Sequence, residues 1–174
     1  VPAEIFRFEI GVQSASAETL LQVNRRADLQ RIFDNVRRLR VDTAIELHLD
    51  LVAGLPGEDY DGLLSSLQAV AGLTPHVIQL EPLKLLKGAP MREIADRLGY
   101  RYSAAPPYTI LTTPWLGYGD ICRIEDIGRL LDLFYNQGGF AAALDFMLER
   151  MDFAELFDSM ARAALGMDLC GRST

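Results

Sequence analysis

The sequence predicts an α/β fold in which three parallel strands alternate with helices and a helical appendage follows at the carboxyl end. Alternating apolar and polar residues mark three short strands before residue 85. Apolar residues at helical spacing fill the intervals between these strands. Strands that alternate with helices form a parallel sheet, because each crossover places a helix over a sheet face. From about residue 117 the apolar spacing is helical.

The three strands are expected near residues 5–13, 44–53 and 76–83. In the second strand the two faces separate clearly, with Ile45, Leu47, Leu49 and Leu51 on one and Glu46, His48 and Asp50 on the other. We therefore expect the apolar set to lie under the helices and the polar set to face the concave side of the sheet.

Helices are expected where apolar residues recur at helical spacing. Ser16 before Glu18–Leu21 resembles a helix start, a second helical segment runs from Asp28 to Leu39, and a third runs from Glu58 to Leu73. A short helix is expected over 90–98 and a short extended piece over 108–113. These elements suggest two units, residues 1–88 with the sheet and residues 89–174, which are mostly helical.

Composition narrows the functional classes. The chain has 174 residues, is 49% hydrophobic and carries a formal net charge of −7, so it can bury a core and lacks the basic surface that binds nucleic acid. No apolar run approaches the roughly 20 residues that span a bilayer. Cys122 and Cys170 have no local partner, which favours reduced thiols and a cytoplasmic location. The amino end lacks Met and a leader, so we expect a piece of a longer protein.

Polar residues at the carboxyl ends of strands are the candidate site. Gln13 ends the first strand, Asp50 lies near the end of the second, and Arg25 follows the first helix. Ligands of parallel α/β folds gather at this end of the strands. An amide, a carboxylate and a guanidinium suit the hydroxyl, amino and carboxylate groups of a nucleoside-bearing ligand. Glu9 and His48 are weaker candidates on the same polar face.

Two other functional classes remain open on this pattern. The polar faces are merely solvated if the chain is a non-catalytic interaction module, whose acidic tail from Asp145 to Asp168 would dock a partner. Alternatively Glu46, His48 and Asp50 could serve a metal-dependent hydrolase. Their alternate spacing on one strand disfavours metal ligation, and no second histidine cluster supports it. We therefore expect no metal ligands in this chain.

Three runs then make a family resemblance specific: EIGVQS at 9–14, VNRR at 23–26 and HLDLVAGLPGE at 48–58. Their order and spacing resemble the catalytic barrel of radical S-adenosylmethionine enzymes, including the oxygen-independent coproporphyrinogen oxidases. The resemblance implies that the sheet is the second half of a partial (β/α) barrel. It also implies that Gln13, Arg25 and Asp50 contact S-adenosylmethionine.

The carboxyl half adds a narrower resemblance. QLEPLKLLKG at 79–88, PPY at 106–108 and FYN at 134–136 resemble the tail of bacterial proteins in which a cobalamin-binding domain precedes the radical barrel. Such proteins are often compared with the anaerobic magnesium-protoporphyrin ester cyclases. The resemblance implies cobalamin as a further cofactor of the parent protein.

The resemblance also implies what lies outside this chain. The Cys-x3-Cys-x2-Cys loop that holds a 4Fe–4S cluster in this family would precede residue 1. We therefore expect the chain alone to be inactive and its main partner to be the amino-terminal half of the same polypeptide. The parent would be an oxidoreductase that cleaves S-adenosylmethionine reductively and abstracts hydrogen from an unidentified small molecule. An isolated half-barrel is expected to self-associate through its open sheet edge.

Overall fold

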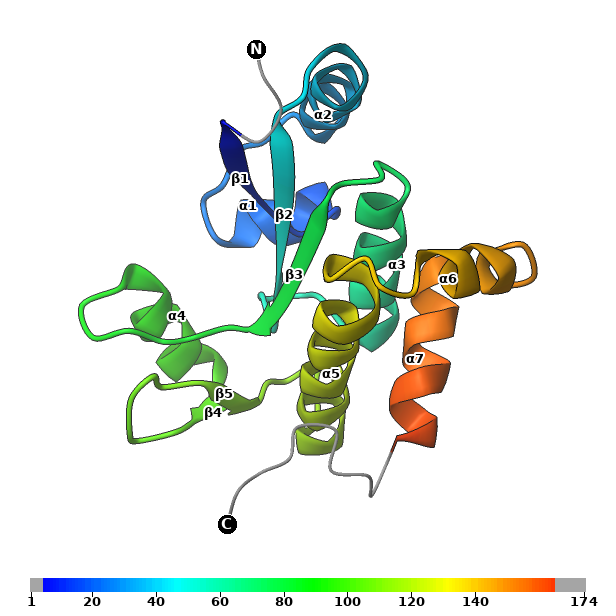
Figure 1. Ribbon diagram of the computed structural model, residues 1–174. Coiled ribbons are helices and arrows are strands. Elements are labelled where there is room, and N and C mark those ends of the chain that lie inside the picture. Colours follow the sequence, from blue (N-terminus) through cyan, green and yellow to red (C-terminus); the bar gives the residue numbers. More distant parts are fainter. Residues whose placement is uncertain (1–4, 165–174) are drawn as a thin grey trace.

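Three parallel strands form the central sheet (Figure 1). The computed structural model describes residues 5–164. The strands are β1 (Arg7–Gln13), β2 (Glu46–Ala53) and β3 (Val77–Pro82), in the spatial order β1-β2-β3. This confirms the predicted α/β class, the parallel pairing and the approximate position of each strand.

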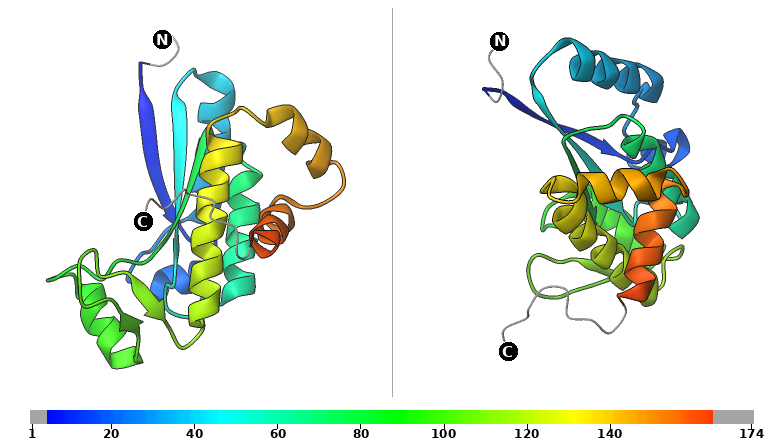
Figure 2. Two further views of the ribbon diagram at one scale, coloured as in Figure 1. Left: turned by 60° about the horizontal axis from the view of Figure 1, so that its bottom comes forward. Right: turned by 45° about the vertical axis from the view of Figure 1, so that its right-hand side comes forward.

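Helices connect the strands and cover one face of the sheet (Figure 2). They are α1 (Ala17–Gln22), α2 (Leu29–Asp42) and α3 (Tyr60–Ala71). Their first turns are capped by Ser16, Asp28 and Asp59, each of which accepts a backbone N–H hydrogen bond. Polar caps of this kind satisfy N–H groups that have no partner inside the helix, so the sequence defines where each helix begins.

The two faces of β2 follow the predicted alternation. Leu47, Leu49 and Leu51 are at most 1% exposed and belong to the core beneath the helices. Glu46 and Asp50 are half-buried on the opposite face, as expected. His48 lies on the same face but, unlike Glu46 and Asp50, it is buried. Its Nε2 lies 2.7 Å from Glu46 Oε1.

A small lobe follows β3 (Figure 1). It contains α4 (Pro90–Leu98) and the antiparallel pair β4 (Arg101–Tyr102) and β5 (Ile110–Thr112). The expected helix and extended piece are therefore both present. Backbone hydrogen bonds from Ile110 N to Leu83 O and from Leu85 N to Tyr108 O attach the lobe to the end of β3.

The carboxyl region is helical, as predicted. It comprises α5 (Tyr118–Leu130), the π-helical turn η1 (Leu131–Asn136), α6 (Ala141–Leu148) and α7 (Phe153–Ala163). One hydrophobic core includes residues of both the sheet and these helices, so the expected division at residue 88 stays a prediction. No helix within residues 5–164 is long and apolar enough to cross a membrane. Asp168 and Cys170, which figured in the predictions, lie outside the described residues.

The edge of β3 that faces away from β2 is covered by the carboxyl helices (Figure 2). Asn136 pairs with both backbone groups of Ile78: its Nδ2 donates to Ile78 O, and its Oδ1 accepts from Ile78 N, each at 3.0 Å. Gly128 of α5 packs so closely that a Cβ there would lie 2.6 Å from Leu80 O. This edge is therefore closed to another strand.

The edge of β1 is open. Within residues 5–164 no strand pairs with β1 on the side away from β2. Phe6 and Phe8 are 51% and 41% exposed beside this edge. The predicted self-association and the predicted amino-terminal partner therefore both have an available strand edge at β1, and both stay predictions.

Candidate functional site

Gly11 is the centre of the candidate site, at the carboxyl end of β1. It pairs in register with Asp50 of β2, and the register then shifts so that Gln13 pairs with Leu51. Gln13 has a φ of 70°, and its side chain folds back so that Nε2 lies 2.5 Å from where a Gly11 Cβ would be. Arg25 Nη1 lies 3.9 Å from the same point. The structure thus brings Gln13, Arg25 and Asp50 together around one residue that has no side chain.

Arg25 reaches the sheet because α1 ends sharply. Asn24 has a φ of 58°, and the backbone N–H of Arg25 donates to Leu20 O at 2.9 Å, which reverses the chain direction. The guanidinium Nη2 then donates to the carbonyl oxygen of Gly11. One bond to the backbone fixes the guanidinium while leaving other N–H groups for a ligand.

Asp50 carries an unsatisfied acceptor. Its Oδ1 is buried and has no hydrogen-bond partner within the described chain. Burial raises the pKa of Asp50, and the carboxylates of Glu9 and Glu81 add to this effect while His48 opposes it. Buried polar atoms are normally hydrogen-bonded, so an orphaned carboxylate oxygen beside a bare glycine is a place where a donor group of a ligand fits.

The weaker candidates Glu9 and His48 lie on the same face, two residues nearer the start of the strands than Gly11 and Asp50. His48 is engaged by Glu46, which also forms an ion pair with Arg7 at 3.1 Å. His48 and Arg7 together hold the pKa of Glu46 below its usual value. Within residues 5–164 no three His, Cys, Asp or Glu side chains are placed to hold a metal ion.

Glu58 is a buried carboxyl group that the sequence analysis missed. Ser14 and Ser66 donate hydrogen bonds to its Oε1 at 2.6 and 3.0 Å, and its Oε2 has no partner within the described chain. Burial raises the pKa of Glu58, and the two serine hydroxyls oppose that shift. These bonds tie the residue after Gln13 to the turn after β2. An acidic residue between a Gly-Leu-Pro-Gly turn and a helix is normally solvated, so no local pattern predicts this burial.

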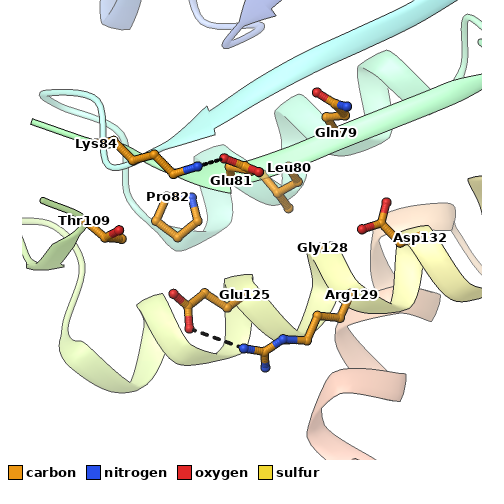
Figure 3. Close-up of a pocket in the computed structure, with 10 residues that line it drawn as sticks. All are labelled: Gln79, Leu80, Glu81, Pro82, Lys84, Thr109, Glu125, Gly128, Arg129 and Asp132. Carbon is orange, nitrogen blue, oxygen red and sulfur yellow. Dashed lines mark hydrogen bonds and ion pairs between the residues drawn. The ribbon is translucent and has the colours of Figure 1, made fainter. Parts of the chain in front are cut away.

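A polar cleft lies next to the site, between β3 and α5 (Figure 3). Its volume is about 270 Å³. Lys84 pairs with Glu81 on the strand side, and Arg129 lies 3.9 Å from Glu125 on the helix side. The sequence did not indicate this cleft, because it depends on where α5 packs.

A solved structure described as "Coproporphyrinogen III oxidase (HemN) from Escherichia coli is a Radical SAM enzyme" matches 75% of this chain with a TM-score of 0.52. The chain has the fold of part of a radical S-adenosylmethionine barrel. Helices at its carboxyl end add to this barrel segment. The identity is 24%, so the likeness concerns the fold.

Two sequence comparisons each match part of this chain. "Uncharacterized protein YtqA" from Bacillus subtilis (strain 168) is 36% identical over 83 residues, or 48% of this chain. A family model described as "Protein of unknown function (DUF4080)" matches residues 96–162, which include α5, α6 and most of α7. The chain spans 26% of the Bacillus protein and 27% of the Escherichia coli enzyme.

Proposed function

We propose that this chain supplies part of the S-adenosylmethionine site of a radical S-adenosylmethionine enzyme. The observation that carries the proposal is the orphaned Oδ1 of Asp50 beside Gly11, flanked by Gln13 and Arg25. Asp50 supplies a hydrogen-bond acceptor, Gln13 supplies both a donor and an acceptor, and Arg25 supplies a cation. S-adenosylmethionine offers hydroxyl groups, an ammonium and a carboxylate, so the donor set fits this cofactor.

Each residue has a distinct binding role in this proposal. Asp50 accepts hydrogen bonds from a hydroxyl or ammonium group. Arg25, already fixed on the Gly11 carbonyl, pairs with a carboxylate through its remaining N–H groups. Gln13 orients a polar group over Gly11, while Glu9 and His48 border the site farther along the sheet.

S-adenosylmethionine bound to a 4Fe–4S cluster supplies reductive cleavage and hydrogen abstraction from a substrate. The residues of this chain bind and orient, and the cluster ligands would come from other strands of the parent protein. The open edge of β1 and the exposed Phe6 and Phe8 support a segment that pairs there. A cobalamin-binding domain in the parent is a further part of this proposal and rests on the sequence resemblance alone.

The test uses the full-length parent protein with its cluster assembled. Asp50→Ala and Arg25→Ala each remove a charge-assisted contact, so S-adenosylmethionine affinity should fall about ten- to a hundredfold. Asp34→Ala is the matched control, because Asp34 is an exposed carboxylate on α2 that pairs with Arg37. The iron–sulfur absorption spectrum should stay unchanged in all three. Wild-type affinity in both site variants would remove these residues from the cofactor site.

A further inference from the structure

The cleft between β3 and α5 has the form of a second binding site beside the proposed cofactor site (Figure 3). We propose that it binds the substrate, and that this substrate is a small polar molecule carrying a positive charge. This inference rests on the proposed function, because the bound molecule is a substrate only if the parent protein is an enzyme of that kind. The cleft and its charge are features of the chain itself.

Polar side chains from β3 and the segment just beyond it face polar side chains from α5 and η1 across the cleft. The strand side contributes Gln79, Glu81 and Lys84, and the helix side contributes Glu125, Arg129 and Asp132. The volume of about 270 Å³ is just below the usual range for ligand sites, which is roughly 300–1,000 Å³. A molecule the size of an amino acid, a polyamine fragment or an amino sugar fits such a space.

The walls of the cleft are fixed by direct contacts between α5 and β3. Gly128 brings the helix backbone against Leu80 O, where a Cβ would lie at 2.6 Å. Just beyond α5, Asn136 holds both backbone groups of Ile78. Because both contacts are with the β3 backbone, the cleft is preformed and does not need a ligand to hold its sides in place.

The strand side of the cleft lies on the strand next to the one that carries Asp50. Gln79 pairs in register with Asp50, and Glu81 pairs with Val52, so the strand side of the cleft is one strand away from Asp50. Neighbouring strands are about 4.8 Å apart. The Glu81 carboxylate also contributes to the raised pKa of Asp50, which agrees with this closeness. A molecule in the cleft therefore lies next to a ligand held by Asp50.

The charge of the cleft indicates the class of molecule. Three carboxylates line it, against two cations. Lys84 is paired with Glu81, and Arg129 is paired with Glu125 and, at 2.7 Å, with Asp126. Asp132 accepts a hydrogen bond from the neutral Asn136 amide at 2.7 Å and has no ion pair within residues 5–164. An ammonium or guanidinium group would neutralise Asp132, whereas a polyanion would meet three carboxylates.

The test measures binding of simple probes to the full-length parent by calorimetry. The cationic probes are agmatine, putrescine, argininamide and glucosamine, and the anionic probes are glutarate, citrate and glucose 6-phosphate. At least one cationic probe should bind, and the anions should not. Asp132→Asn and Glu125→Gln should each lower the affinity for the cationic probe by about tenfold, because each removes a charge-assisted contact. Glu149→Gln removes the same charge from an exposed position at the end of α6 that does not line the cleft, and should have no effect.

Three outcomes would overturn the inference: no cationic probe binds, anions bind better than cations, or both cleft variants keep wild-type affinity for the cation. S-adenosylmethionine binding, measured separately on the same proteins, distinguishes this failure from failure of the proposed function. If the cofactor binds and the cations do not, the cleft assignment alone is wrong. If the cations bind in the cleft and the cofactor does not bind, the cleft stands and the proposed function is wrong.

Discussion

Replacing Glu58 by alanine should destabilise the chain more than any exposed carboxylate replacement. Glu58 is 3% exposed and accepts hydrogen bonds from Ser14 and Ser66, which are 0% and 2% exposed. The two serine oxygens are 3.5 Å apart, so one hydroxyl can turn to the other after Glu58 is lost. One buried hydroxyl donor then remains without an acceptor.

The size of the effect follows from these contacts. One unsatisfied buried donor costs about 1–3 kcal/mol, and loss of one buried methylene adds about 0.8 kcal/mol. We therefore expect Glu58→Ala to lower the free energy of unfolding by about 2–4 kcal/mol. With a urea slope of about 2 kcal/mol per molar, the unfolding midpoint should fall by about 1–2 M.

The same carboxyl group should make stability depend on pH. Burial raises the pKa of Glu58 in the folded chain above its ordinary value of 4.5. Above that ordinary value the unfolded chain therefore binds fewer protons than the folded chain, and the contribution of Glu58 to stability falls as pH rises through the folded pKa. Glu58→Gln cannot ionise, so the wild-type free energy of unfolding minus that of this variant should fall from pH 5 to pH 8.

Urea unfolding followed by circular dichroism measures both effects. Glu149→Ala is the control, because the Glu149 side chain is 70% exposed. The reasoning would be refuted if Glu58→Ala cost no more than Glu149→Ala. It would also be refuted if the difference between the wild type and Glu58→Gln stayed constant or rose between pH 5 and pH 8.

Two further predictions concern the contact between the carboxyl helices and β3. Gly128→Ala should lower the free energy of unfolding by about 1–3 kcal/mol, because the new Cβ would meet Leu80 O. Gly119 lies on the same helix with open space around it, so Gly119→Ala should raise that free energy by about 0.5–1 kcal/mol. Equal shifts of the melting temperature for the two variants would contradict the close packing at Gly128. Asn136→Ala should speed amide hydrogen exchange at Ile78 and cost about 1–3 kcal/mol, since it removes both bonds to that residue. Unchanged exchange at Ile78 would show that Asn136 does not close the strand edge.

The strands and helix starts were predictable because their signals are local. Alternation at 44–53 defined β2, and Ser16 caps α1 as its sequence position indicates. The convergence of Gln13 and Asp50 also followed from a general property of parallel sheets, in which strand ends share one edge. Periodicity was thus sufficient for the sheet and for part of the candidate site.

The remaining features depend on residues far apart in the chain. Ser14 meets Glu58 across 44 positions, and Asn136 meets Ile78 across 58. No local pattern encodes such pairs, since they arise only after helices and strands have packed.

The covered edge of β3 limits how copies of this chain can join. Asn136 and Gly128 cover the β3 edge of the central three-stranded sheet, so the β1 edge is the one edge of that sheet left open within residues 5–164. If two copies pair through their β1 strands, the open edge of each copy is covered by the other, and the pair is closed with two-fold symmetry. A third copy finds no strand to extend. Association through this sheet therefore ends at a dimer instead of continuing into a fibre, although each copy exposes a bare β-strand.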